Sequence, residues 1–81
     1  MQPDPLPLRE HALVVLTCEP PSPRLSRGDI GTVVFVYPDA AGVEVEFIDG
    51  GGHTIAVETL AASDVRAVAA NEILHARPLP V

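Results

Sequence analysis

The stretch VEVEFIDGGGHTIAVETL, residues Val43–Leu60, decides the fold. Its first half alternates strictly, so Val43, Val45 and Phe47 share one face of a strand and the two intervening glutamates share the other. The glycine-rich DGGGH then interrupts the apolar pattern, and a second run rich in β-branched residues follows. Two such runs separated by a turn predict an antiparallel β-hairpin.

On the second strand of this hairpin we expect Ile55 and Val57 to face the core and Glu58 to face solvent. Glu44, Glu46 and Glu58 should then form an acidic stripe across neighbouring strands. An open strand face offers no pocket and no desolvation, which argues against acid–base catalysis by these carboxylates. The stripe is either a solvated face or a contact surface for a basic partner.

Short apolar runs on either side of the hairpin supply the remaining strands. HALVVLTCE (11–19) ends at a Pro-Pro pair, and IGTVVFVY (30–37) is apolar on both faces, so we expect it to be central and covered on both sides. PDAAG (38–42) predicts a turn, and SDVRAV predicts a short helical turn before a last strand at 65–68. The sequence therefore predicts a mainly β protein, a small SH3-like antiparallel barrel of about five strands with one short helical turn.

The two ends of the chain differ from this core. Residues 1–9 carry three prolines at alternate positions and predict a flexible arm, residues 10–68 form the barrel, and residues 69–81 form a tail. A weak helical pattern in AANEILHAR leaves a docked helix, a strand or disorder open for this tail.

The charge balance is acidic, with five arginines, no lysine and eleven carboxylates, for a net charge of −6. This disfavours a protein that binds nucleic acid mainly through phosphates and favours basic partners. The single cysteine permits no internal disulfide and suits a reducing compartment. Because we find neither a signal-peptide pattern nor a membrane-span pattern, we expect a cytoplasmic protein.

The tripeptide Arg27-Gly28-Asp29 matches a cell-adhesion signal, but we interpret it as a structural turn. Gly28 would supply a positive φ or a close-packed position before the strand, Asp29 would cap the turn through a backbone N–H, and Gly31 would permit a bulge where the strand bends. The alternative is a nucleic-acid contact loop that uses Arg24 and Arg27 together with Arg66.

The glycines before His53 resemble a phosphate cradle, but a strand follows them where such a cradle needs a helix. We therefore interpret Asp49 and Gly52 as hairpin-turn residues. The three histidines have no metal-ligand spacing, and Cys18 has no histidine close enough along the chain to activate it. We expect no cofactor, no metal site and no catalytic residue.

The core resembles a bacterial domain of unknown function, number 4926, through VVLT, LSRGDIGTVVFVY, VEVEFIDGGGHTIAVETL and SDVRAV. The resemblance covers about Ala12 to Val68. It implies a barrel related to the small β-domain of nitrile hydratase, and it supplies no catalytic motif. The Pro-rich arm, the tail, the PPSPR loop and the Gly50–Gly52 run depart from the family pattern, which leaves partner specificity open.

Members of this family sometimes lie beside a gene for another small protein, which implies an antitoxin or immunity-type partnership. We therefore expect a non-enzymatic interaction module with one protein partner, bound through Glu44, Glu46 and Glu58 or through the loop of Arg24 and Arg27. We expect a monomer or weak homodimer. The alternatives are a nucleic-acid-binding domain that uses Arg24 and Arg27, and an accessory domain of an enzyme complex.

Overall fold

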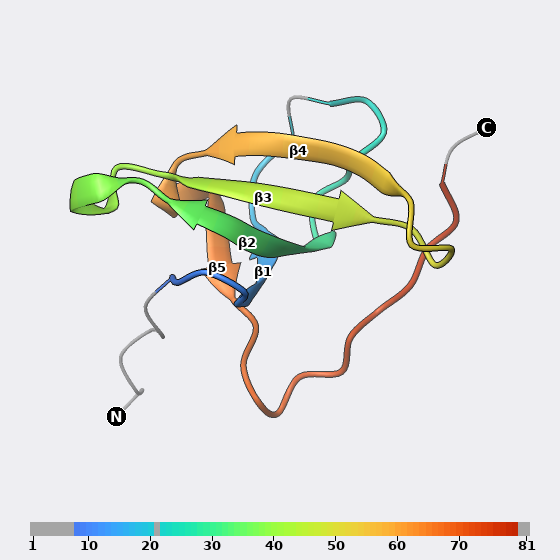
Figure 1. The fold of residues 1–81 in the computed structure, drawn as a ribbon. Helices are drawn as coiled ribbons and strands as arrows, with labels where there is room; N and C mark the ends of the chain where they lie inside the picture. Colours follow the sequence, from blue (N-terminus) through green and yellow to red (C-terminus); the bar gives the residue numbers. More distant parts are fainter. Residues whose placement is uncertain (1–7, 21, 80–81) are drawn as a thin grey trace.

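The computed structural model describes residues 8–20 and 22–79. Its elements are β1 (Leu13–Leu16), β2 (Ile30–Val36), the 3-10 turn η1 (Pro38–Ala40), β3 (Val43–Ile48), β4 (Thr54–Leu60), the 3-10 turn η2 (Ala62–Asp64) and β5 (Val65–Ala67). All paired strands are antiparallel in one sheet of order β4-β3-β2-β1-β5 (Figure 1). The prediction of a mainly β fold with about five antiparallel strands is confirmed, with two short helical turns rather than one.

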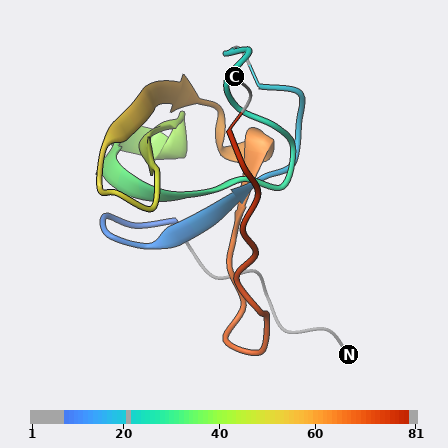
Figure 2. The ribbon, with the colours of Figure 1, turned by 90° about the vertical axis from the view of Figure 1, so that its right-hand side faces the viewer.

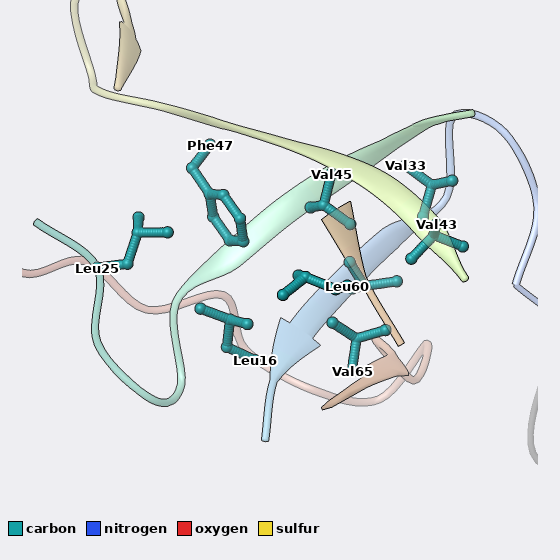
Figure 3. Packing of buried hydrophobic residues seen from close by; sticks show 9 residues of the cluster. Leu16, Leu25, Val33, Val43, Val45, Phe47, Leu60 and Val65 are labelled. Atoms are coloured by element: carbon teal, nitrogen blue, oxygen red, sulfur yellow. The ribbon is translucent and has the colours of Figure 1, made fainter. Parts of the chain in front are cut away.

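The sheet curves strongly around a single core, so that β5 and β1 lie across from β4 and β3 (Figure 2). This curvature is compatible with the SH3-like barrel that we expected. Branched apolar side chains from every strand and one leucine from the loop before β2 converge inside it (Figure 3). The buried residues are Val14, Leu16, Leu25, Val33, Val43, Val45, Phe47, Leu60 and Val65.

Gly31 is buried on β2, at a position that leaves no room for a side chain. A Cβ at this position would lie 2.5 Å from Val45 Cγ1 and 2.8 Å from Phe47 Cε1. The bulge that we expected at Gly31 instead falls between Val33 and Phe35, where the pairing with β3 shifts register. Gly31 therefore serves close packing of the strands, and the bend is made further along β2.

The expectation that β2 is covered on both faces is wrong. β2 is central in strand order, but Val34 and Phe35 are exposed, the latter by 45%. A single sheet that curls around one core has only one covered face, since no second layer packs against its outside. The apolar residues on the outside of β2 therefore lie on the surface.

The side chains of β4 also face other sides of the sheet than we expected. Ala56 pairs with Phe47 and Ile48 pairs with Thr54, so Ile55 is an extra residue at a register shift. This shift turns Glu58 to the core side of the sheet and Val57 to the outside, where Val57 is 52% exposed. The predicted faces of Val57 and Glu58 were the wrong way round.

The chain after β5 contains no helix or strand over the described residues 69–79, so the helix that we considered for the tail does not form there. This segment leaves the sheet, turns back and runs past the open end of the curved sheet (Figures 1 and 2). Most of the predicted N-terminal arm, residues 1–7, lies outside the described residues. Within residues 8–20 and 22–79 no helix has the length and apolarity that a membrane span requires.

Candidate protein-interaction surface

Strands β2, β3 and β4 form a continuous outer face on the solvent side of the sheet. Two rows of paired residues cross all three strands: Thr32–Glu46–Val57 and Phe35–Glu44–Thr59. Directly paired residues project to the same side of a sheet. We call these six residues, with Tyr37, Ile48 and Thr54 beside them, the outer sheet face.

Hydroxyl groups hold the two carboxylates of this face. Tyr37 Oη donates to Glu44 Oε1 at 2.6 Å, and Thr59 Oγ1 donates to the same oxygen. Thr54 Oγ1 donates to Glu46 Oε2 at 2.7 Å. The bonds from Thr59 and Tyr37 hold the pKa of Glu44 below its usual value, because they stabilise the ionised form. Both carboxylates are thus fixed, and Glu44 stays charged over the whole neutral range.

Apolar and aromatic side chains surround these carboxylates. Phe35 and Tyr37 meet edge to face with ring centroids 5.0 Å apart, and both rings are exposed. Ile48 and Val57 are exposed beside them by more than half of their surface. Exposed rings and two hydrogen-bonded carboxylates therefore lie together on one face of the sheet.

The charges of the chain are segregated around this surface. Residues 30–60 contain five carboxylates and neither lysine nor arginine, whereas all five arginines lie before residue 30 or after residue 60. Nothing on these strands therefore neutralises Glu44 and Glu46. The outer sheet face therefore carries two carboxylates and no basic residue from its own strands.

Glu58 does not belong to this surface. Its pairing partner is Val45, a fully buried residue, so its side chain leaves β4 on the opposite face from Glu44 and Glu46. The predicted stripe of three glutamates is therefore a pair. The register shift at Ile55 separates Glu58 from the other two, and strict alternation along the sequence gave no sign of it.

The loop that contains Arg24 and Arg27 is built as a turn. Gly28 has φ +94°, and its N–H donates to the carbonyl of Leu16 at 2.8 Å. Asp29 Oδ2 accepts from the backbone N–H of Ser26 at 2.8 Å, which is the cap that we expected from an aspartate here.

Of the three arginines that the nucleic-acid hypothesis requires, one is already paired with a carboxylate. Arg66 donates to both carboxylate oxygens of Glu72 at 2.7 Å each. Its charge is therefore neutralised locally by the tail. Arg24 and Arg27 remain exposed on their loop, which leaves a small positive area on an acidic molecule.

The β3–β4 turn is organised by Asp49. Its Oδ1 accepts from the N–H groups of Gly51 and His53, each at 2.9 Å, and Gly52 has φ +83°. The bond from the His53 backbone is the main cause of the lowered pKa of Asp49. His53 Nδ1 lies 3.2 Å from the same carboxylate. Over the described part of the chain, no three histidine, cysteine or carboxylate side chains gather as a metal ion would require.

Cys18 is half-buried beside Asp64. Partial burial and the neighbouring carboxylate both raise the pKa of the thiol, so little of it is thiolate near neutral pH. These surroundings are the reverse of those that activate a nucleophilic cysteine.

One contact could not be anticipated from the sequence. Arg77 in the tail donates from Nε to Asp29 Oδ1 at 2.7 Å and from Nη2 to Asp29 Oδ2 at 2.6 Å. The two residues lie 48 positions apart, and no spacing or motif links them. The aspartate of the Arg-Gly-Asp turn thus has a second function as the acceptor for the tail.

Comparison with known proteins places the core of the chain in a family. Residues 10–67 match the family model described as Domain of unknown function (DUF4926). No curated protein and no solved structure matches the chain. The matched range includes all five strands, both faces of the sheet and the Arg-Gly-Asp turn, and it ends before the tail that carries Glu72 and Arg77. The chain belongs to the DUF4926 family of domains of unknown function.

Proposed function

We propose that this protein is a non-enzymatic interaction module that binds a basic segment of a partner protein through the outer sheet face. The observation that carries this proposal is the pair of fixed carboxylates, Glu44 and Glu46, among the exposed rings of Phe35 and Tyr37. The absence of any lysine or arginine from residues 30–60 leaves these charges available to a cation from outside.

The geometry favours binding over catalysis at this surface. A general acid needs a carboxyl group whose pKa is raised towards neutrality, whereas the hydrogen bonds on Glu44 lower it. Carboxylates that are already held by hydroxyls lose little side-chain entropy when a cation binds, which favours recognition of lysine or arginine. Phe35 and Tyr37 add ring faces and edges on which an arginine or lysine side chain can pack.

We further propose that the partner is encoded beside this protein, in an antitoxin or immunity-type pair. The family resemblance supports this second proposal, because members of the family sometimes lie beside a gene for another small protein. Electrostatic complementarity would then serve specificity and fast association, which such pairs require.

The test uses charge-neutral variants of matched size. The full chain with Glu44→Gln and Glu46→Gln is compared with a control that carries Glu19→Gln and Glu58→Gln, which changes the net charge equally but lies outside the outer sheet face. The partner is captured from the native host at moderate salt and identified by mass spectrometry, and its affinity is then measured by calorimetry.

We expect the outer-face double variant to bind at least tenfold more weakly and the control to bind as the wild type does. Binding should also weaken as the salt concentration rises. An equal loss in both double variants would mean that only net charge matters, and unchanged binding in the outer-face variant would refute the proposal.

A further inference from the structure

Two side chains of the segment after the family core pair with the barrel, Glu72 with Arg66 and Arg77 with Asp29. Arg77 makes a two-pronged pair with Asp29, and its Nη2 also donates to the carbonyl of Arg24 at 3.0 Å. Asp29 is mostly buried in this pair, with 16% of its side chain exposed. Partial burial alone would raise the pKa of Asp29, but the bonds from Arg77 and Ser26 outweigh it and lower that pKa.

A cavity of about 380 Å³ lies between this segment and the barrel. The barrel side of the cavity is mostly apolar and comes from the loop before β2, from β3 and its turn, and from β4. This side is lined by Leu25, Asp29, Ile30, Phe47, Ile48, Asp49, Gly50 and Ile55. The other wall is the tail itself, through residues 75–77 and 79. Without the tail, the cavity would be an open groove with two carboxylates among mostly apolar lining residues.

The groove carboxylate that pairs with Arg77, Asp29, is positioned without help from the tail. Asp29 accepts from the N–H of Ser26, and its backbone carbonyl accepts from the N–H of Leu16 at 2.9 Å, so the turn and β1 fix it. The residues that make the groove all lie inside the matched family range, whereas the segment that occupies it lies outside that range.

We propose that this groove is a second binding site, which takes an extended, arginine-bearing segment of another protein, and that residues 75–79 of this chain occupy it in cis. The chemistry of the ligand is taken from the occupant. An arginine guanidinium pairs with Asp29 through two parallel bonds, as the planar fork of arginine allows and lysine does not. An apolar residue two positions later, Leu79, also lines the cavity.

Because the tail is covalently attached, it competes strongly with a segment of another protein for the groove. A short flexible linker gives its end an effective concentration on the order of millimolar at the groove. A segment of similar intrinsic affinity from another protein can then enter only at comparable concentration, or when the Arg77 contact is broken. Removal of Arg77 should therefore uncover binding in trans.

The experiment uses the full chain labelled with ¹⁵N and, as the probe, a synthetic peptide of residues 72–79, EILHARPL. We expect the peptide to bind the Arg77→Ala chain at least tenfold more tightly than the wild-type chain. Amide resonances should shift at Leu25, Asp29, Ile30 and Gly50, which line the groove and lie outside the outer sheet face. A peptide with alanine in place of its arginine should lose this binding.

One further variant and one measurement on the wild-type chain keep the test decisive. In the Arg77→Ala background, Asp29→Asn preserves the shape of the acceptor but removes its charge, and we expect peptide binding to fall at least tenfold. If Arg77→Ala does not fold, millimolar peptide added to the wild-type chain should displace the Arg77 Nε resonance. Equal affinity of both chains, no effect of Asp29→Asn, or shifts confined to the outer sheet face would overturn the proposal. A wild-type dimer that dissociates on Arg77→Ala would assign the groove to a second copy of this chain and would also overturn it.

Discussion

Replacement of Gly31 by alanine tests the central packing argument most directly. The added Cβ would lie 2.5 Å from Val45 Cγ1, 2.8 Å from Phe47 Cε1 and 2.9 Å from the carbonyl oxygen of Glu46. The two side chains belong to the buried core, and the carbonyl belongs to a strand paired on both sides. The methyl group therefore cannot be accommodated by the movement of a flexible side chain alone.

The magnitude follows from two opposing terms. An extra methyl group in a well-packed core costs about 1–3 kcal/mol, and the contact with a backbone atom favours the upper half of that range. The loss of glycine from the unfolded chain returns about 0.4–1 kcal/mol. The net loss is about 1–2 kcal/mol, against a total stability of about 4–12 kcal/mol for a domain of this size.

The assay is urea unfolding followed by far-ultraviolet circular dichroism, with Gly50→Ala as the matched control. With a slope of about 1 kcal/mol per molar urea, the midpoint of Gly31→Ala should fall by about 1–2 M. A Cβ on Gly50 meets nothing within 4 Å and its φ is not positive, so that variant should match or slightly exceed the wild type. If the two variants unfold at the same midpoint, the close approach of β2 and β3 is not what requires glycine at position 31.

Core burial, a positive φ and the Arg66–Glu72 pair can each be tested in solution. Leu16→Ala removes a side chain that is 1% exposed and should cost about 2–5 kcal/mol in urea unfolding, whereas Leu13→Ala, at a residue 40% exposed, should cost clearly less. Gly28→Ala has space for its methyl group but keeps φ +94°, so it should cost about 1–2 kcal/mol relative to Gly50→Ala in the same assay, and equal midpoints would contradict the strain argument. The bonds from Arg66 and the Ala69 N–H lower the pKa of Glu72 to about 2, so the stability that this pair contributes is fully present above the unfolded pKa of 4.5 and disappears as the pH falls towards 2. An NMR titration of Glu72 with a midpoint near 4.5 would show that the pair does not form in solution.

The β-hairpin and the mainly β fold were predictable because local pattern determined them. The alternation of VEVEFI specifies one buried face, and the residues that it selects, Val43, Val45 and Phe47, are buried. The glycine and aspartate signals of the two turns likewise coincide with positive φ at Gly28 and Gly52. These features depend on residues within a few positions of one another, which a sequence pattern can express.

Only the two carboxylates of the candidate surface were predictable for the same reason. Glu44 and Glu46 follow from the alternation of β3, but Glu58 was placed with them because the extra residue at Ile55 carries no local signature. The exposed rings of Phe35 and Tyr37 were likewise expected to be covered. An apolar run on both faces indicates burial on average, but a single curved sheet has nothing to cover its outside.

The sequence by itself determined the strands, their turns, the core face of β3 and the acidity of residues 30–60, since each depends on composition or on periodicity of two. Only the tertiary structure decided which strands pair, in what register, and hence which carboxylates share a face. It also decided that Arg77 meets Asp29 across 48 residues. The physical reason is that register and long-range pairing are set by how the sheet closes around a shared core, to which residues from every strand and the intervening loop contribute together.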